Sequence, residues 1–224
     1  LTEIRDGDVF IGNDAYTGGG THLPDLVLAE PIFFEGALVG WATNTAHHAD
    51  FVDRGHAHIF QEGIRIPPIR LYRAGVLQQD VLDVILLNLQ VPRERLADLR
   101  AQQAANGQGI RRFRELCGRY GRETVLAASE ALLDYAERLT RSGISTIPPG
   151  TYTFEDTFDS EELPEILAFT VSIRVADDEI HLAFDAPPQV RAGFNLVETG
   201  LLATVYYALK TLIGPDIPPN AGFF

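Results

Sequence analysis

The pattern of hydrophobic and polar positions predicts strands in the first part of the chain. From Asp8 to Ala49, short apolar and β-branched runs alternate with turn residues. Two of these runs, residues 26–34 and 37–45, flank the pair Glu35-Gly36. An acidic residue before glycine, between two such runs, is typical of a two-residue hairpin turn. The N-terminal part is therefore expected to be rich in β-hairpins.

Helical spacing dominates the middle of the sequence. Apolar residues recur at helical intervals over residues 81–89, and Pro92 suits the first turn of a second helix whose apolar positions continue to residue 120. The pair Asn106-Gly107 marks one position at which this second helix could break. A further apolar stripe, with charged residues on its opposite side, predicts a third helix over residues 125–139.

Strands return at Gly150, and the fold class follows from this order. Apolar residues alternate with polar or small ones over 169–175 and again over 180–184, which predicts a second hairpin. The apolar segment 198–213, which ends at Gly214-Pro215, is expected to form a buried helix. The fold is therefore predicted to be mixed α+β. Residues 1–224 are expected to form a single mixed domain or a fragment of a larger subunit, with a sub-boundary near residues 145–150 as the alternative.

Composition and charge exclude several classes of protein. The formal net charge of -13 repels phosphate backbones, which makes nucleic acid an unsuitable partner. The longest apolar stretch, residues 196–213, carries Glu198 and Lys210, so no membrane span is expected. A single cysteine, Cys117, permits no intrachain disulfide and fits a reducing compartment, for which we expect the cytoplasm.

Histidine and aspartate residues with metal-binding chemistry meet at the first predicted hairpin. His22 and Asp25 stand at the start of one arm, and the pair His47-His48 follows the other arm. A two-residue turn at Glu35-Gly36 would pair Asp25 with residue 46 and bring one of the two histidines back to Asp25. Which histidine faces Asp25 stays open, because a change of one residue in register reverses the face. The arrangement predicts a site with two histidines and one carboxylate.

A purely structural role is the alternative for these residues. His22 would then be a loop histidine bonded to backbone, Asp25 would cap a turn, and the histidine pair would lie at a solvated strand end. Asp14, Asp50 and Asp53 lie near these positions in the sequence, where aspartate is common as a turn former. The Gly18-Gly19-Gly20 loop is not a phosphate-binding loop, because no Lys-Ser or Lys-Thr follows it.

Several motifs taken together resemble the hydantoinase B/oxoprolinase family, over the chain from about Asp6 to its last residue. The motifs are Asn13-Asp14-Ala15-Tyr16, Gly19-Gly20-Thr21-His22-Leu23-Pro24-Asp25, Ala46-His47-His48-Ala49-Asp50, Glu62-Gly63-Ile64-Arg65-Ile66-Pro67-Pro68 and Asp98-Leu99-Arg100-Ala101-Gln102. Members of this family are the B-type subunits of ATP-dependent N-methylhydantoinases, the corresponding half of 5-oxoprolinase, and the alpha subunit of acetone carboxylase. The chain is shorter than these proteins.

The resemblance implies a function and a set of site residues. It implies a divalent metal ion (zinc, manganese or iron) held by His22, Asp25 and one histidine of the pair, for which His47 is the first choice. We expect Asp14 or Asp50 to act as general base. The chain would belong to the catalytic subunit of an enzyme that opens a small cyclic amide such as a hydantoin or 5-oxoproline.

The resemblance also implies a partner. An A-type hydantoinase subunit would bind ATP, and the enzyme would be a hetero-oligomer. One alternative function is that of an acetone-carboxylase-like alpha subunit, and a second is that of a truncated assembly module without catalytic activity.

Overall fold

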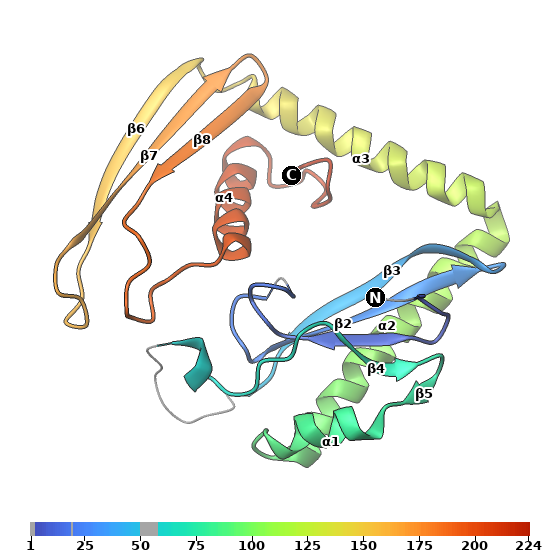
Figure 1. Ribbon diagram of the computed structural model, residues 1–224. Helices are drawn as coiled ribbons and strands as arrows, with labels where there is room; N and C mark the ends of the chain where they lie inside the picture. The colour runs from blue at the N-terminus through green and yellow to red at the C-terminus, as the bar shows by residue number, and fades with distance from the viewer. Residues whose placement is uncertain (1–2, 19, 50–57) are drawn as a thin grey trace. The chain divides into compact units, whose positions relative to one another are not determined.

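A computed structural model of the chain describes residues 3–18, 20–49 and 58–224, and its fold is mixed α+β as predicted (Figure 1). The chain folds into two compact units, Leu1–Leu126 and Ala127–Phe224. The division falls inside a long helix. The connection at residues 145–149, near the predicted sub-boundary, lies within the second unit.

The first unit is built on a five-stranded antiparallel sheet with the strand order β3-β2-β1-β4-β5. Its strands are β1 (Val9–Gly12), β2 (Asp25–Phe34), β3 (Ala37–His47), β4 (Ile69–Arg73) and β5 (Val76–Leu77). The predicted N-terminal hairpin is therefore confirmed as the β2–β3 pair, which forms one edge of the sheet.

The turn of the β2–β3 hairpin has the predicted two residues, but the predicted register is wrong. Glu35 and Gly36 have φ angles of 49° and 79°, the left-handed conformation that a tight hairpin turn requires at both positions. The strands pair Phe33 with Leu38 but Ile32 with Gly40, so Val39 is an extra residue in β3. This bulge shifts the register by one residue, and Asp25 pairs with His47 instead of residue 46.

Two helices pack against this sheet and form the core of the unit. Helix α1 (Gln79–Leu87) contacts β4, and α2 (Pro92–Tyr120) crosses the β2–β3 hairpin (Figure 1). The core contains buried aliphatic side chains from both helices and from one face of the sheet. They include Val9, Ile11, Leu26, Leu28, Leu71, Leu82, Ile85 and Leu99.

The face of α2 that touches the hairpin is more polar than expected. Its buried residues Arg95, Leu99, Gln102 and Asn106 follow one another at helical spacing along a single stripe. The helix does not break at Asn106-Gly107, the position considered for a break, and α2 continues through both residues. The Asn106 side chain does not end the helix because its polar groups bond to Asn44 and to the Leu28 carbonyl.

The second unit contains most of α3, a three-stranded antiparallel sheet and a final helix. The elements are α3 (Arg122–Ile144), β6 (Gly150–Phe158), β7 (Leu167–Ala176), β8 (Glu179–Asp185) and α4 (Glu198–Ile213), with the strand order β6-β7-β8. The predicted second hairpin is confirmed as β7–β8, which closes at the pair Ala176 and Glu179. Among the described helices, none is long and apolar enough to cross a membrane.

Helix α4 is not buried, contrary to expectation. Among its residues only Gly200 is buried, whereas Tyr207 is 78% exposed and Leu212 is 69% exposed. The helix is apolar around most of its circumference, but inside this unit only one side is covered. That side packs with Ala136 of α3 and with the segment that carries Ile217 and Phe223.

Candidate metal centre

Three potential metal ligands meet where the β2–β3 hairpin ends. Asp25 is the first residue of β2, His47 is the last residue of β3, and His22 lies in the loop that leads into β2. Paired residues of antiparallel strands point to the same face, so Asp25 and His47 project together. Their neighbours Leu26 and Ala46 point to the opposite face, where Leu26 joins the helix-covered core.

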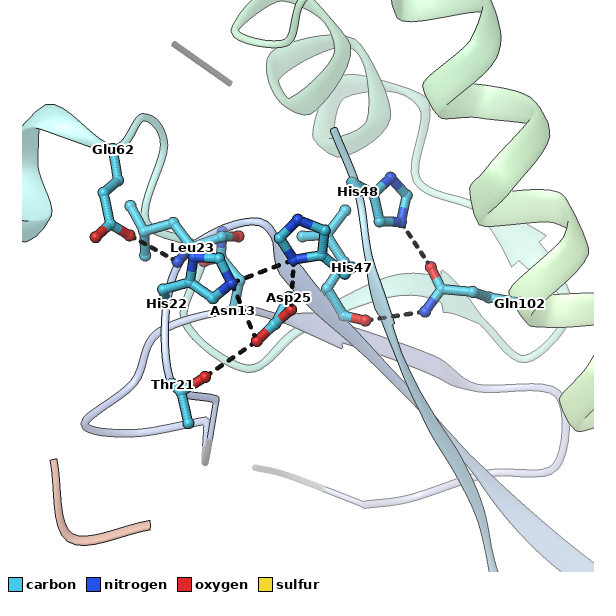
Figure 2. A network of polar contacts seen from close by, with 10 residues as sticks. Asn13, Thr21, His22, Leu23, Asp25, His47, His48, Glu62 and Gln102 are labelled. Carbon is cyan, nitrogen blue, oxygen red and sulfur yellow. Dashed lines mark hydrogen bonds and ion pairs between the residues drawn. The ribbon is translucent and has the colours of Figure 1, made fainter. Parts of the chain in front are cut away.

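The three side chains converge on one point (Figure 2). The Nε2 atom of His22 lies 3.2 Å from Nδ1 of His47 and 3.4 Å from Oδ2 of Asp25. The Nδ1 atom of His47 lies 3.1 Å from Oδ1 of Asp25. The two imidazole rings stack with their centroids 4.9 Å apart.

These separations fit the first coordination shell of a divalent cation. Ligand atoms that lie about 2.0–2.2 Å from a metal are separated by about 3 Å in octahedral geometry and by about 3.5 Å in tetrahedral geometry. The measured separations of 3.1–3.4 Å fall in this range. The side chains of His22, Asp25 and His47 are 39%, 20% and 56% exposed, so solvent and small molecules reach the point where they converge.

The loop that carries His22 is held by hydrogen bonds on both sides of this residue. The Thr21 hydroxyl donates to Oδ2 of Asp25 at 3.1 Å, and the Leu23 amide donates to Oε2 of Glu62 at 3.0 Å. The fully buried Asn13 side chain donates to the Leu23 and Ile64 carbonyls and accepts from the Ile66 amide. Asn13 therefore joins the His22 loop to the segment that precedes β4.

His48 lies on the other side of the hairpin, away from the three ligands (Figure 2). It is 1% exposed, and its Nε2 atom lies 2.9 Å from Oε1 of Gln102 on α2. The bulge at Val39 therefore decides which of the two histidines faces Asp25, a point that the sequence left open. His47 faces Asp25, and His48 faces the helix.

Both carboxylate oxygens of Asp14, an expected general base, accept hydrogen bonds from Thr17 or Arg65. Oδ2 accepts from the hydroxyl and the amide of Thr17, and Oδ1 accepts two bonds from the Arg65 guanidinium. These bonds hold the pKa of Asp14 below its ordinary value, chiefly through the Thr17 hydroxyl, although burial acts in the opposite direction. Such contacts favour a structural role for Asp14. The other expected base, Asp50, lies outside the described residues.

The lowered pKa of Asp14 predicts how the stability of the first unit depends on pH. A carboxyl group whose pKa is lowered by folding contributes stability above its unfolded-state pKa of about 3.9, and this contribution is lost as the pH falls through the folded-state value. Asp14→Asn should therefore lower the free energy of unfolding at pH 7, and the difference from wild type should shrink below pH ~4. Urea titrations followed by the fluorescence of Trp41, the only tryptophan, measure this. A difference that stays constant down to acidic pH would contradict the structural role.

The residues that support the centre were harder to predict than the ligands. Asn13, Glu62 and Gln102 stand in motifs that carry the family resemblance, but their hydrogen bonds span between 10 and 76 residues of sequence. Nothing in the local pattern indicates which distant backbone groups they bind. In the sequence, the one indication of their role is that these three residues are polar and stand beside predicted core positions.

Comparisons with known proteins agree on one family. A sequence model of hydantoinase B/oxoprolinase matches residues 1–224. The chain is 33% identical over 234 residues to the beta subunit of the caprolactamase of Pseudomonas jessenii, covering 99% of this chain and 39% of that protein. It is 30% identical over 242 residues to the B-type subunit of a putative D-/L-hydantoinase of Pseudomonas sp. (strain NS671), covering 98% of this chain and 40% of that protein.

The fold has a counterpart among solved structures. The crystal structure of the ATP-dependent caprolactamase from Pseudomonas jessenii superimposes with a TM-score of 0.89 and 32% identity, covering 99% of this chain and 40% of that one. The chain therefore spans about two fifths of the length of these relatives.

Proposed function

The chain belongs to the hydantoinase B/oxoprolinase family, and from this premise we propose that it carries the metal centre of an ATP-dependent enzyme that hydrolyses a cyclic amide. The observation that carries the proposal is the convergence of His22, Asp25 and His47 on one accessible point. Two imidazoles and a carboxylate are ligands that suit zinc, manganese or iron.

The proposed centre would activate an amide bond, which is otherwise unreactive toward water. A bound divalent cation polarises a carbonyl group and lowers the pKa of a water molecule, and both effects favour hydrolysis of an unreactive amide. His22, Asp25 and His47 would hold the cation from one side. Their partial exposure leaves the other side open to a small substrate. Thr21 and Glu62 would keep the His22 loop in place through their hydrogen bonds.

A partner subunit is proposed to supply ATP. Two of the relatives are themselves named as single subunits, one of a caprolactamase and one of a hydantoinase, which supports a multi-subunit enzyme. The net charge of -13 disfavours capture of a polyanion by this chain alone, and its glycine-rich loop lacks the lysine of a phosphate-binding loop. We therefore assign ATP to an A-type subunit and the metal centre to this one, in the cytoplasm.

Because ATP is assigned to a partner subunit, the 224-residue chain alone should not open a hydantoin, 5-oxoproline or caprolactam ring, with or without ATP. The complete subunit, assembled with its ATP-binding partner, should release the ring-opened product together with ADP. Chromatography of the product and a coupled ADP assay measure both. ATP-dependent turnover by the isolated chain would contradict the assignment.

Variants of the complete enzyme test the role of the centre. Asp25→Asn should abolish ring opening, whereas His181→Ala, a histidine substitution at an exposed position of β8, should leave it unchanged. Full ring-opening activity in Asp25→Asn would overturn the proposal. Carboxylation of a ketone without any ring opening would replace it with the acetone-carboxylase alternative.

A further inference from the structure

One side-chain amide of α2 holds both strands of the hairpin beside the candidate metal ligands. Gln102 is 7% exposed, and its Nε2 atom donates to the Leu26 carbonyl at 2.9 Å and to Oδ1 of Asn44 at 2.8 Å. Its Oε1 atom lies 2.9 Å from Nε2 of His48. Leu26 directly follows Asp25, and His48 directly follows His47. The amide therefore contacts the chain neighbour of one ligand on each strand.

The orientation of this amide is fixed by its partners. A backbone carbonyl can only accept a hydrogen bond, so the NH2 group of Gln102 must face Leu26 and its oxygen must face His48. His48 consequently donates from Nε2 and carries no proton on Nδ1 in its neutral form. This Nδ1 atom is buried and has no hydrogen-bond partner among the described residues. In this arrangement the Gln102 oxygen accepts the Nε2 proton of His48.

Strand β1 does not extend far enough to pair with the end of the hairpin that carries Asp25 and His47. The last pair between β1 and β2 is Gly12 with Val27, so Leu26 and Asp25 lie beyond the end of β1. His48 lies beyond the end of β3, where its amide donates to the Pro24 carbonyl. Backbone pairs join the two strand ends to each other, and the Gln102 contacts add a bond from α2 to each of them.

We propose that Gln102 is a positioning residue of the metal centre, which acts by clamping Leu26 and His48 so that Asp25 and His47 stay at coordination distance. The proposal rests on the proposed function, because it concerns the same metal site. Residues that orient metal ligands change metal affinity by about 10–100-fold when they are replaced. Gln102 would belong to this class although it contacts neither ligand side chain.

Asn106 provides a matched control on the same stripe of α2. It is 4% exposed, and it accepts from Nδ2 of Asn44 at 2.8 Å and donates to the Leu28 carbonyl at 3.4 Å. Its contacts are polar, buried and directed to the same two strands, but they lie further from the ligands. A merely structural role for the polar stripe would make both residues equally important for the metal.

The test compares Gln102→Leu with Asn106→Leu in the purified chain by isothermal titration with zinc and with manganese. Gln102→Leu should weaken binding of the metal by about 10–100-fold, and Asn106→Leu by less than about 3-fold, although both variants lower the melting temperature. Equal affinity in Gln102→Leu and wild type would overturn the proposal. If Gln102→Leu does not fold, Gln102→Glu replaces it, since a carboxylate keeps the volume but cannot donate to Leu26.

A measurement on the metal-free chain separates this proposal from the proposed function. Long-range ¹H–¹⁵N spectra should show the Nε2 proton of His48 protected from exchange with solvent in wild type and in Asn106→Leu, but exchanging rapidly in Gln102→Leu. Equal protection in all three proteins would overturn the clamp. Absence of metal binding in wild type would contradict the proposed function, whereas the exchange result would still decide whether Gln102 holds the hairpin end.

Discussion

His22→Ala and Asp25→Ala should each empty the metal centre while leaving the helix content unchanged. Each variant removes one of three converging ligand atoms, and because replacement of an orienting residue already costs about 10–100-fold in affinity, loss of a ligand should cost at least about 100-fold. Both residues are partly exposed, so their removal leaves no cavity in the core. Equilibrium dialysis against zinc or manganese measures the bound metal, and circular dichroism measures the helix content.

Two further variants test whether the loss of metal is specific to the three converging ligands. His47→Ala should behave like His22→Ala, because the bulge at Val39 turns His47 toward Asp25. His181→Ala should bind metal like wild type, because its side chain pairs with Glu179 of the same strand and is not one of the three converging ligands. Stoichiometric metal in His22→Ala and Asp25→Ala would exclude this centre as the binding site.

Asn13→Ala should destabilise the first unit by about 3 kcal/mol, because it leaves buried backbone groups without partners. The variant loses bonds to the carbonyls of Leu23 and Ile64 and to the amide of Ile66, at distances of 2.7–2.9 Å. Because Leu23 follows His22, metal affinity should fall as well. Urea unfolding followed by Trp41 fluorescence gives the stability, since Trp41 lies in β3 of this unit.

Asn88→Ala is the control for this substitution. Asn88 is exposed, and its side chain makes a bond to the Val84 carbonyl, so its loss should cost at most about 1 kcal/mol. If Asn13→Ala were no more destabilising than Asn88→Ala, Asn13 would not be the link that holds the His22 loop to the segment before β4.

The sequence was sufficient to predict the elements of the fold but not the register that decides the site. Glu35-Gly36 requires left-handed backbone at both positions, which local sequence signals well. The bulge at Val39 has no such signal, because an apolar β-branched residue is ordinary in a strand. Its effect is nevertheless decisive, since the shift of one residue selects His47 over His48 as the partner of Asp25.

Long-range contacts account for the other differences. The buried contacts of Gln102 and Asn106 were not predicted, because their partners on β2 and β3 lie 58 or more residues away. Helix α4 was expected to be buried because it is apolar around its axis. Within the second unit, however, only its side toward Ala136 is covered. Periodicity identifies an apolar surface, but it does not indicate how much of that surface a neighbour covers.

Elemental analysis of the purified chain, after dialysis against zinc, manganese or iron and removal of free ions, tests the central proposal most directly. Wild type should retain about one metal ion per chain, as expected for one set of converging ligands, and Asp25→Ala should retain almost none. Metal at the same level in both proteins, or no metal in wild type, would contradict a metal centre formed by His22, Asp25 and His47.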